Sequence, residues 1–236
     1  MGDDASVQQG LTIAIDGPAG AGKSTVSREV ALRLGYTYID SGAMYRAVAH
    51  TAIGQGIRLD NHDMCAQLAG AITITFDHAV PPNVFLDGVN VTPQLRTAEL
   101  GIAASIVSQH AGVRTELVRQ QQRLGEGGGI VMEGRDIGTV VFPDADVKIY
   151  LTATVAERAR RRVQELVSRG QDVSLPTIMR QIEERDQRDM NRSDSPLRVA
   201  DAAWEFVTDG VTIEEVINQI VSHIQKLGPQ QTLDPG

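Results

Sequence analysis

The stretch from Gly17 to Ser24 constrains the fold of this chain more than any other part of its sequence. It reads Gly-Pro-Ala-Gly-Ala-Gly-Lys-Ser, follows an apolar run at 11–15 and leads into helix-like residues at 26–34. A strand, a glycine-rich loop and a helix in this order are typical of a phosphate-binding loop. Glycines let the backbone curl round an anion, and the N–H groups that begin a helix attract one. A glycine-rich turn without a ligand is the alternative, which the agreement of spacing, strand and helix disfavours.

The loop pattern also predicts what each part of it binds. We expect Lys23 and the loop backbone to hold the β- and γ-phosphates of a nucleotide, and the Ser24 hydroxyl to contact Mg²⁺. The predicted nucleotide-binding residues are Gly17, Pro18, Ala19, Gly20, Ala21, Gly22, Lys23, Ser24 and Thr25.

Composition argues against several classes of partner and location. The 236 residues carry 22 Lys and Arg against 30 Asp and Glu, a net charge of −8, so we expect no binding to nucleic acid or to an anionic membrane. The single cysteine, Cys65, excludes an intrachain disulfide and is expected in the core. The polar segment 1–10 lacks the features of a signal peptide, and no apolar run could span a bilayer. We expect a cytoplasmic protein with flexible tails at 1–10 and 226–236.

Five short apolar runs predict the strands of one sheet. Helix-like segments separate most of them, which predicts an α/β fold with a five-stranded parallel sheet flanked by helices. The predicted strands lie at about 11–15, 36–39, 130–133, 147–151 and 204–208. Further helices are expected near 43–53, 97–107, 113–124, 157–169, 176–190 and 211–224.

Residues 60–96 have a different texture. A short helical stretch at 64–68 precedes apolar residues that alternate along the chain between 72 and 86, with turns at Pro81-Pro82-Asn83 and Asp87-Gly88. This pattern predicts a small β-rich insertion.

Candidate site residues follow the predicted strand 36–39. The candidates at its carboxyl end, where open α/β sheets bind ligands, are Asp40, Ser41, Tyr45 and Arg46. Each has a purely structural alternative: Ser41 could cap the next helix, Tyr45 could lie in the core, and Arg46 could be a solvated charge. Their position beside a phosphate loop favours a site.

A second group, Glu133, Arg135 and Asp136, follows the predicted strand 130–133. A structural ion pair is one explanation. Two carboxylates and an arginine at this edge also suit a site that binds phosphate and magnesium together.

Two arginine-rich helices follow, at 157–169 and 176–190. Arg158 and Arg162 share a helical face, and Arg192 comes just beyond the second helix. Arg185 and Asp189 also share a face, so we expect them to hold each other, with a solvated surface ion pair as the alternative. Such charge runs are usually solvated faces, but phosphoryl transfer needs mobile positive charge, so we expect a lid. Ser105 and Arg114 lie on earlier helices, and the sequence alone does not direct them toward a pocket.

Four blocks of sequence, at 16–25, 40–46, 133–143 and 184–193, resemble the successive signatures of bacterial cytidylate kinases. The resemblance covers roughly 11–225. It implies one kinase domain with a core (11–59, 97–152 and 193–225), an enlarged insertion that binds the nucleoside monophosphate (60–96) and a lid (153–192).

The resemblance also implies an activity, the transfer of the γ-phosphoryl group of ATP, with Mg²⁺, to CMP or dCMP by a monomer. Ser41, Arg114 and Asp136 would then read the cytosine, and Arg46, Arg135 and Arg192 would grip the acceptor phosphate. Ser105, Arg185 and Asp189 would meet the sugar, Tyr45 would wall the pocket, and Arg158 and Arg162 would close over ATP. The catalytic set would be Lys23, Arg135, Arg158, Arg162 and Arg192. Glu133 stands where many members have Asp, and would make an outer-sphere contact to magnesium.

Two other functions share parts of this pattern. A kinase for another nucleoside monophosphate or a small metabolite would have the same loop and lid, and differ in what it reads on the acceptor. A GTPase-like switch would share the loop, but the sequence contains no Asn-Lys-x-Asp run to read guanine and carries arginine-rich helices that a switch does not need.

Overall fold

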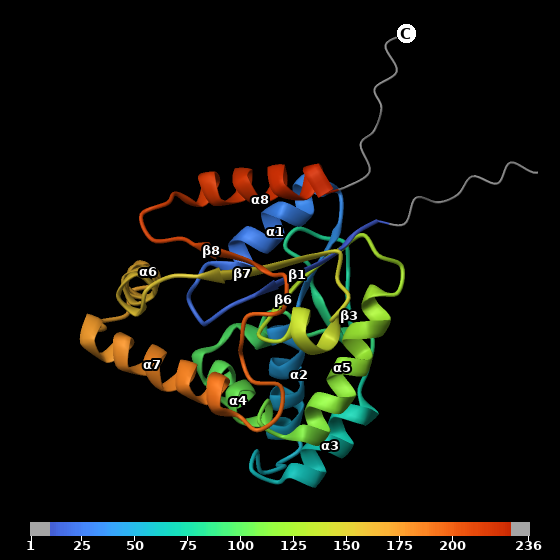
Figure 1. The fold of residues 1–236 in the computed structure, drawn as a ribbon. Helices are drawn as coiled ribbons and strands as arrows, with labels where there is room; N and C mark the ends of the chain where they lie inside the picture. The colour runs from blue at the N-terminus through green and yellow to red at the C-terminus, as the bar shows by residue number, and fades with distance from the viewer. Residues whose placement is uncertain (1–9, 228–236) are drawn as a thin grey trace, which may run out of the picture.

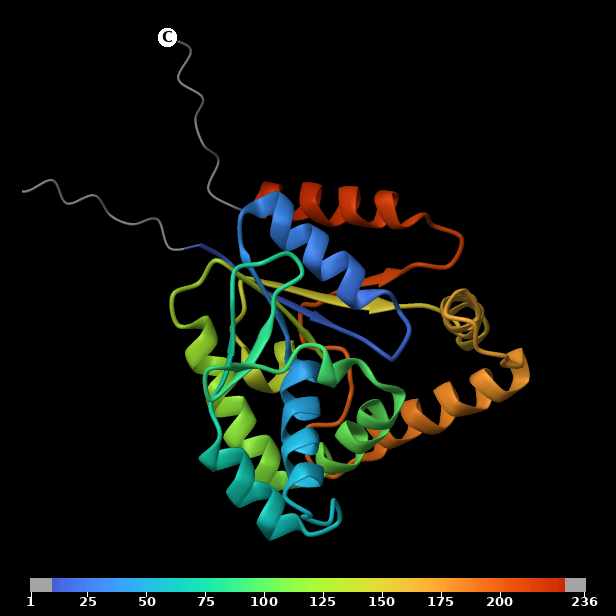
Figure 2. The same cartoon turned by 180° about the vertical axis from the view of Figure 1, so that it is seen from behind.

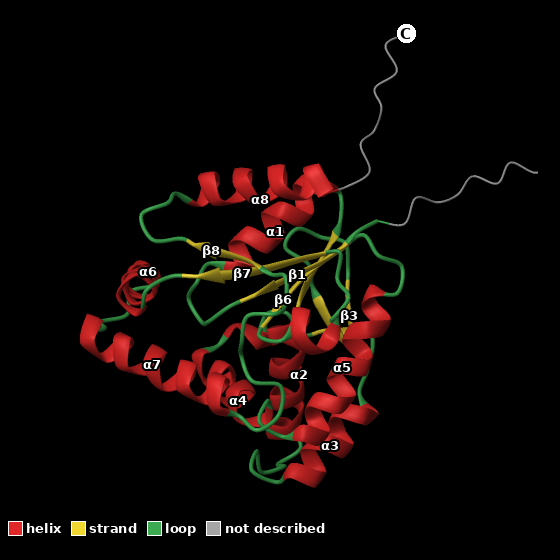
Figure 3. Cartoon of the chain, viewed as in Figure 1, coloured by secondary structure: helices red, strands yellow, loops and turns green. Residues whose placement is uncertain are grey.

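The computed structural model describes residues 10–227, so most of both predicted tails, 1–9 and 228–236, lies outside the described residues. Five parallel strands form the central sheet in the order β2-β6-β1-β7-β8. Figure 3 shows the strands in yellow and the helices around them in red. Their bounds are β1 Thr12–Asp16, β2 Thr37–Asp40, β6 Ile130–Gly134, β7 Val147–Thr152 and β8 Trp204–Val207. The predicted α/β fold with a five-stranded parallel sheet is therefore confirmed.

Helices cover both faces of this sheet (Figure 1). The alternation along β1 decides which residues face which layer. Ile13 and Ile15 pack against α1 (Lys23–Leu34) and α8 (Ile213–Leu227) on one face. Ala14 lies on the other face, in a cluster that includes residues of α5 (Ala111–Gly125).

A second apolar core lies beneath this other face. It joins α2 (Ser41–Gly54), α3 (His62–Ala71), α4 (Ala98–Val107) and α5, and it contains the buried Cys65. Ile74 and Val84 enter it from a small antiparallel sheet, seen from behind in Figure 2. The strands of this sheet are β3 Ile74–Phe76, β4 Val84–Leu86 and β5 Val89–Asn90. The predicted β-rich texture of this region is confirmed, although β5 was not predicted.

Two helices, α6 (Val155–Ser168) and α7 (Leu175–Asn191), extend from the end of β7 (Figure 1). The Thr154 and Ser174 side chains cap their first turns. The two helices pack on one another through a small apolar cluster of their own, separate from the central core. None of the helices within 10–227 is long and apolar enough to cross a membrane.

Two local features differ from the sequence-based expectation. Helix α1 begins at Lys23 rather than near 26, because Gly22 has a left-handed φ of 91° and serves as its N-cap. A single π-helical turn occupies Ile137–Val141, where no element was predicted. Such turns are rare and are frequently found at functional sites.

Candidate functional site

The carboxyl ends of three neighbouring strands bring the predicted site segments together. Asp16 of β1 lies opposite Gly134 of β6, and Asp40 of β2 lies opposite Glu133. Three segments therefore meet at the carboxyl end of the sheet: the phosphate loop after β1, helix α2 after β2, and the segment 135–136 after β6.

The phosphate loop has no room for a larger residue at its first position. A Cβ on Gly17 would stand 2.0 Å from the carbonyl oxygen of Leu151, and its φ is 147°. The Lys23 ammonium turns back to donate to the Pro18 carbonyl at 2.8 Å. Ser24 and Thr25 are exposed in the first helical turn, and Ser24 lines a hollow that a ligand could enter.

Electrostatics in the loop suit an anion. Burial, with the nearby Arg135 guanidinium, lowers the pKa of Lys23 to about 7, and the Glu133 and Asp16 carboxylates oppose the shift. A bound phosphate would add a negative charge beside the lysine and favour its protonated form. The loop therefore fits nucleotide phosphates.

Glu133 is buried next to the loop. Burial, followed by the charge of Asp40, raises its pKa, and its Oε1 accepts a hydrogen bond from the Tyr38 hydroxyl. No three His, Cys, Asp or Glu side chains within residues 10–227 form a metal cluster. Mg²⁺ needs few protein ligands because it keeps several waters, so oxygen donors such as Ser24 and Glu133 fit it.

A buried charged cluster lies beside Glu133. Arg114 and Asp136 form an ion pair in which their side chains are 2% and 7% exposed, and an Arg192 nitrogen lies 3.6 Å from the second Asp136 oxygen. The Arg114 guanidinium lies over the Tyr45 ring at 5.8 Å. Four predicted residues that are far apart in the sequence are thus brought together.

Ser41 is held against the same strand end. Its hydroxyl donates to the Glu133 carbonyl oxygen at 2.6 Å. The alternative that Ser41 caps helix α2 is wrong, because the Asp40 side chain accepts from the Ala43 N–H and makes the cap itself. Tyr45 lies in the apolar core, which was its structural alternative, and the Arg114 guanidinium lies over its ring.

The predicted sugar-binding residues are arranged differently from the expectation. Arg185 and Asp189 were expected to hold each other, but Asp189 accepts instead from Arg135 Nε at 2.9 Å. Burial, with Arg135 nearby, lowers the pKa of Arg185 to about 10. Within the described chain, Arg185 Nε and the buried Ser105 hydroxyl have no hydrogen-bond partner. The alternative of a solvated surface pair is also wrong, because Asp189 is buried.

A groove of about 170 Å³ separates the phosphate loop from the small sheet. Ser24, Tyr38 and Asp40 line one wall, together with Arg46, whose guanidinium pairs with Asp40 at 2.6 Å. The small sheet and the loops around it supply the other wall. Arg46 therefore lies beside the loop rather than on a solvated face.

The two predicted lid arginines have different surroundings. Arg158 is buried, donates to the Ala19 carbonyl at 3.0 Å and pairs with Asp186 of α7 at 2.7 Å. It joins α6 and α7 to the phosphate loop. Arg162 is more exposed and pairs with Glu165 on its own helix at 2.7 Å, so the structure does not bring it to the site.

Three residues near the site were given no role on sequence grounds. They are Tyr38, which bonds Glu133, Asp186, which holds Arg158, and Asp16. Asp16 is buried and its two oxygens accept from the Ile137 and Gly138 N–H groups at 2.9 and 2.7 Å. Its place at the end of the strand before the loop was the available signal.

Asp16 predicts a pH dependence of folding. Burial raises its pKa from 3.8 to about 6, although the two N–H donors oppose the shift. The folded state thus holds the proton more tightly than the unfolded chain. The contribution of this protonated carboxyl group to the free energy of unfolding is therefore fully present below pH 3.8, and it is lost as the pH rises through about 6. The unfolding free energy of the wild type minus that of Asp16→Asn should fall by about 2 kcal/mol between about pH 4.5 and about pH 6.5. Urea unfolding of both proteins at several pH values measures this difference. A difference that stays constant over the pH range would contradict the prediction.

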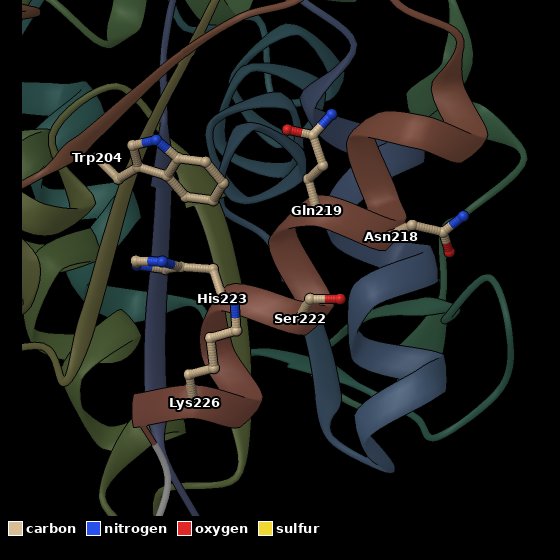
Figure 4. A pocket seen from close by; sticks show the side chains of 6 residues that line it. All are labelled: Trp204, Asn218, Gln219, Ser222, His223 and Lys226. Atoms are coloured by element: carbon tan, nitrogen blue, oxygen red, sulfur yellow. The ribbon is translucent and has the colours of Figure 1, made fainter.

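A second hollow lies elsewhere on the molecule. It has a volume of about 370 Å³ and is lined by β8 and α8, where Trp204 faces His223 with ring centroids 4.4 Å apart (Figure 4). None of the predicted site residues lines it.

Comparison with known proteins agrees with this geometry. A family model described as cytidylate kinase matches residues 13–226. A cytidylate kinase of Limosilactobacillus fermentum is 48% identical over 219 residues, which cover 92% of this chain and 97% of that protein. A bifunctional pantoate ligase/cytidylate kinase of Trichormus variabilis is 50% identical over 91% of this chain, which spans only 41% of that relative's length.

Among solved structures, an uncharacterized protein from Eubacterium ventriosum superposes with a TM-score of 0.51 at 10% identity. The match covers 92% of this chain and 98% of that chain. A likeness at this identity supports the fold alone. The family is shown by the model match and by the relatives that align from end to end: this chain belongs to the cytidylate kinase family.

Proposed function

We propose that this protein transfers the γ-phosphoryl group of ATP to CMP or dCMP, giving ADP and CDP or dCDP. One observation carries the proposal: the phosphate loop and the buried Arg114–Asp136 pair, with Arg192 beside it, meet at one edge of the sheet. This arrangement supports a donor site for phosphates with a polar reader of the base beside it.

The donor side uses the loop and its neighbours. Residues 17–25 would wrap the ATP phosphates, with Lys23 on the β- and γ-phosphates and Arg158 above the loop. Ser24 would hold Mg²⁺ directly, and Glu133 would hold one of its waters. When bound, the ion neutralises charge on the phosphates.

The acceptor side uses the buried cluster and the lid. Asp136 accepts from the cytosine amino group while Arg114 and Ser41 bond other edges of the base. Arg46, Arg135 and Arg192 grip the acceptor phosphate, since paired guanidinium groups match a phosphate dianion. The unpartnered Ser105 hydroxyl and Arg185 Nε, with Asp189, support contacts to the sugar.

The chain's own chemistry is positioning and charge neutralisation. The acceptor phosphate is itself the nucleophile, so no general base is required. Lys23 and the arginines stabilise the charge that spreads over the transferred group. Closure of α6 and α7 keeps water away from ATP. Arg162 belongs to the catalytic residues as one that reaches ATP only after this closure.

The proposal also includes a division into core, insertion (60–96) and lid (153–192), a monomeric state and a cytoplasmic location. The net charge of −8 supports free nucleotides, rather than nucleic acid or a membrane, as the partners. Sedimentation of the purified protein measures the monomeric state.

A coupled assay for ADP formation tests the function. ATP is supplied with each of CMP, dCMP, UMP, AMP, GMP and dTMP in turn. CMP and dCMP should be the best acceptors by kcat/KM. A clear preference for another acceptor would replace this proposal by a different nucleotide kinase.

The sugar contact gives a separate prediction. Asp189→Ala should lower kcat/KM for CMP more than for dCMP, because only ribose has a 2′-OH that would lose a partner. The ratio of the two kcat/KM values, expressed as a free energy, should narrow by about 1–2 kcal/mol. Steady-state kinetics with both substrates measure this.

The control for this variant is Glu184→Ala, which removes an exposed carboxylate from the same helix. It should leave both substrates unchanged. Because Asp189 also holds Arg135, a loss of equal size for CMP and dCMP would assign Asp189 to holding that arginine rather than to reading the sugar.

A further inference from the structure

Asp16 stands between the two halves of the proposed site. It is the last residue of β1, directly before Gly17, and its side chain is buried. Its Oδ1 accepts from the Ile137 N–H and its Oδ2 from the Gly138 N–H, across 121 and 122 positions of the chain. One carboxylate thus joins the phosphate-loop strand to the segment that follows Arg135 and Asp136.

The two N–H groups that Asp16 accepts belong to the start of the π-helical turn Ile137–Val141. The first N–H groups of a helix have no partner within it and need an outside acceptor. An aspartate at the N-cap position usually supplies one. Asp136 holds that position, yet its side chain makes no cap bond and instead pairs with Arg114.

We propose that Asp16 is a positioning residue which takes over the cap of this turn and so leaves the Asp136 carboxylate free to read the acceptor base. The inference rests on the proposed function, in which Asp136 binds cytosine. Without Asp16, the N–H groups of Ile137 and Gly138 need a new acceptor, and Asp136 already occupies the N-cap position of this turn. A carboxylate drawn toward these donors leaves Arg114 and the base.

Because of the strand packing, the cap made by Asp16 links the phosphate loop to the segment proposed to read the acceptor base. Asp16 pairs with Gly134 in the sheet, and a Cβ on Gly17 would stand 2.0 Å from the Leu151 carbonyl oxygen, so the end of β1 is closely surrounded by its neighbouring strands. The segment that carries Arg135 and Asp136 is therefore held at a fixed place relative to the phosphate loop. An effect on the acceptor base, greater than on ATP, distinguishes this role from a general contribution to folding.

The test compares Asp16→Asn with Asp146→Asn. Asp146 is a matched control, because its Oδ2 accepts from the Thr12 N–H at 2.7 Å, at the opposite end of the same strand. Asparagine at position 16 keeps one acceptor but turns an NH₂ group toward the second N–H. We measure kcat/KM for CMP and UMP, KM for ATP, and CMP binding without ATP by calorimetry.

We expect Asp16→Asn to lower kcat/KM for CMP by about 10-fold or more, to weaken CMP binding similarly, and to narrow the preference for CMP over UMP at least about 3-fold. KM for ATP should change less than about 3-fold, and Asp146→Asn should leave the preference unchanged. Equal losses for CMP and UMP, or a rise in KM for ATP as large as that for CMP, would overturn the inference.

A second variant covers a failure to fold. Asp16→Ser keeps one acceptor without opposing the second N–H, and the same comparison applies to it. If neither variant folds while Asp146→Asn does, the role of Asp16 is structural and the inference is wrong. A wild type with no preference for CMP over UMP would instead refute the proposed function, so the two failures are distinguishable.

Discussion

Replacing Lys23 by alanine is expected to lower kcat by a factor of about 100 or more while the protein stays folded. The lysine ammonium lies inside the loop, hydrogen-bonded to the Pro18 carbonyl, with no other lysine in the loop to replace it. Its charge would be lost where negative charge develops on the transferred group. Steady-state kinetics with ATP and CMP measure the effect.

The control is Lys226→Ala, which removes an exposed lysine from α8, beside the hollow of Figure 4. It should keep wild-type kcat. Thermal unfolding of both variants confirms that they fold. A folded Lys23→Ala protein with near-normal kcat would end the assignment of the loop to phosphate binding.

The second large effect is expected at Asp136. Alanine at this position would leave Arg114 buried with its ion pair broken, which destabilises a protein by about 3–5 kcal/mol, so asparagine is the cleaner change. Asp136→Asn should lower kcat/KM for CMP by a factor that corresponds to about 1–3 kcal/mol of lost transition-state stabilisation, because the carboxylate that accepts from the cytosine amino group is lost. The new amide can donate to the carbonyl oxygen at the same place on uracil, so the preference for CMP over UMP should narrow.

Asp194→Asn is the matched control for this variant. Its carboxylate lies 4.0 Å from Arg114 Nε but is 40% exposed, so it shares the arginine without belonging to the buried pair. It should leave the preference for CMP unchanged. If Asp136→Asn discriminated between CMP and UMP as the wild type does, Asp136 would have no part in base recognition.

The central sheet could be predicted from the sequence because each strand is a short apolar run between turn residues. The π-helical turn at 137–141 could not. Its residues, Ile-Gly-Thr-Val-Val, are as apolar as a strand, and its first N–H groups are satisfied by Asp16 from 121 positions away. Local patterns carry no information about such a distant partner.

The candidate site shows the same division. The residues that meet at the sheet edge were predicted because each follows a strand or belongs to a recognisable block. Their pairings could not be predicted, because Arg135 and Arg185 both had a reason to bond Asp189. Only the folded chain shows that Asp189 lies within 2.9 Å of Arg135 Nε. Arg158 and Arg162 look alike on a helical face, yet only Arg158 faces the loop.

The most direct test of the account follows the transferred phosphate itself. The protein is incubated with ATP labelled in its γ-phosphate, with and without CMP, and the nucleotides are separated. The label should appear in CDP when CMP is present, with little free phosphate in either reaction. Label that appears as inorganic phosphate, at the same rate with or without CMP, would show a nucleotide hydrolase and contradict the account.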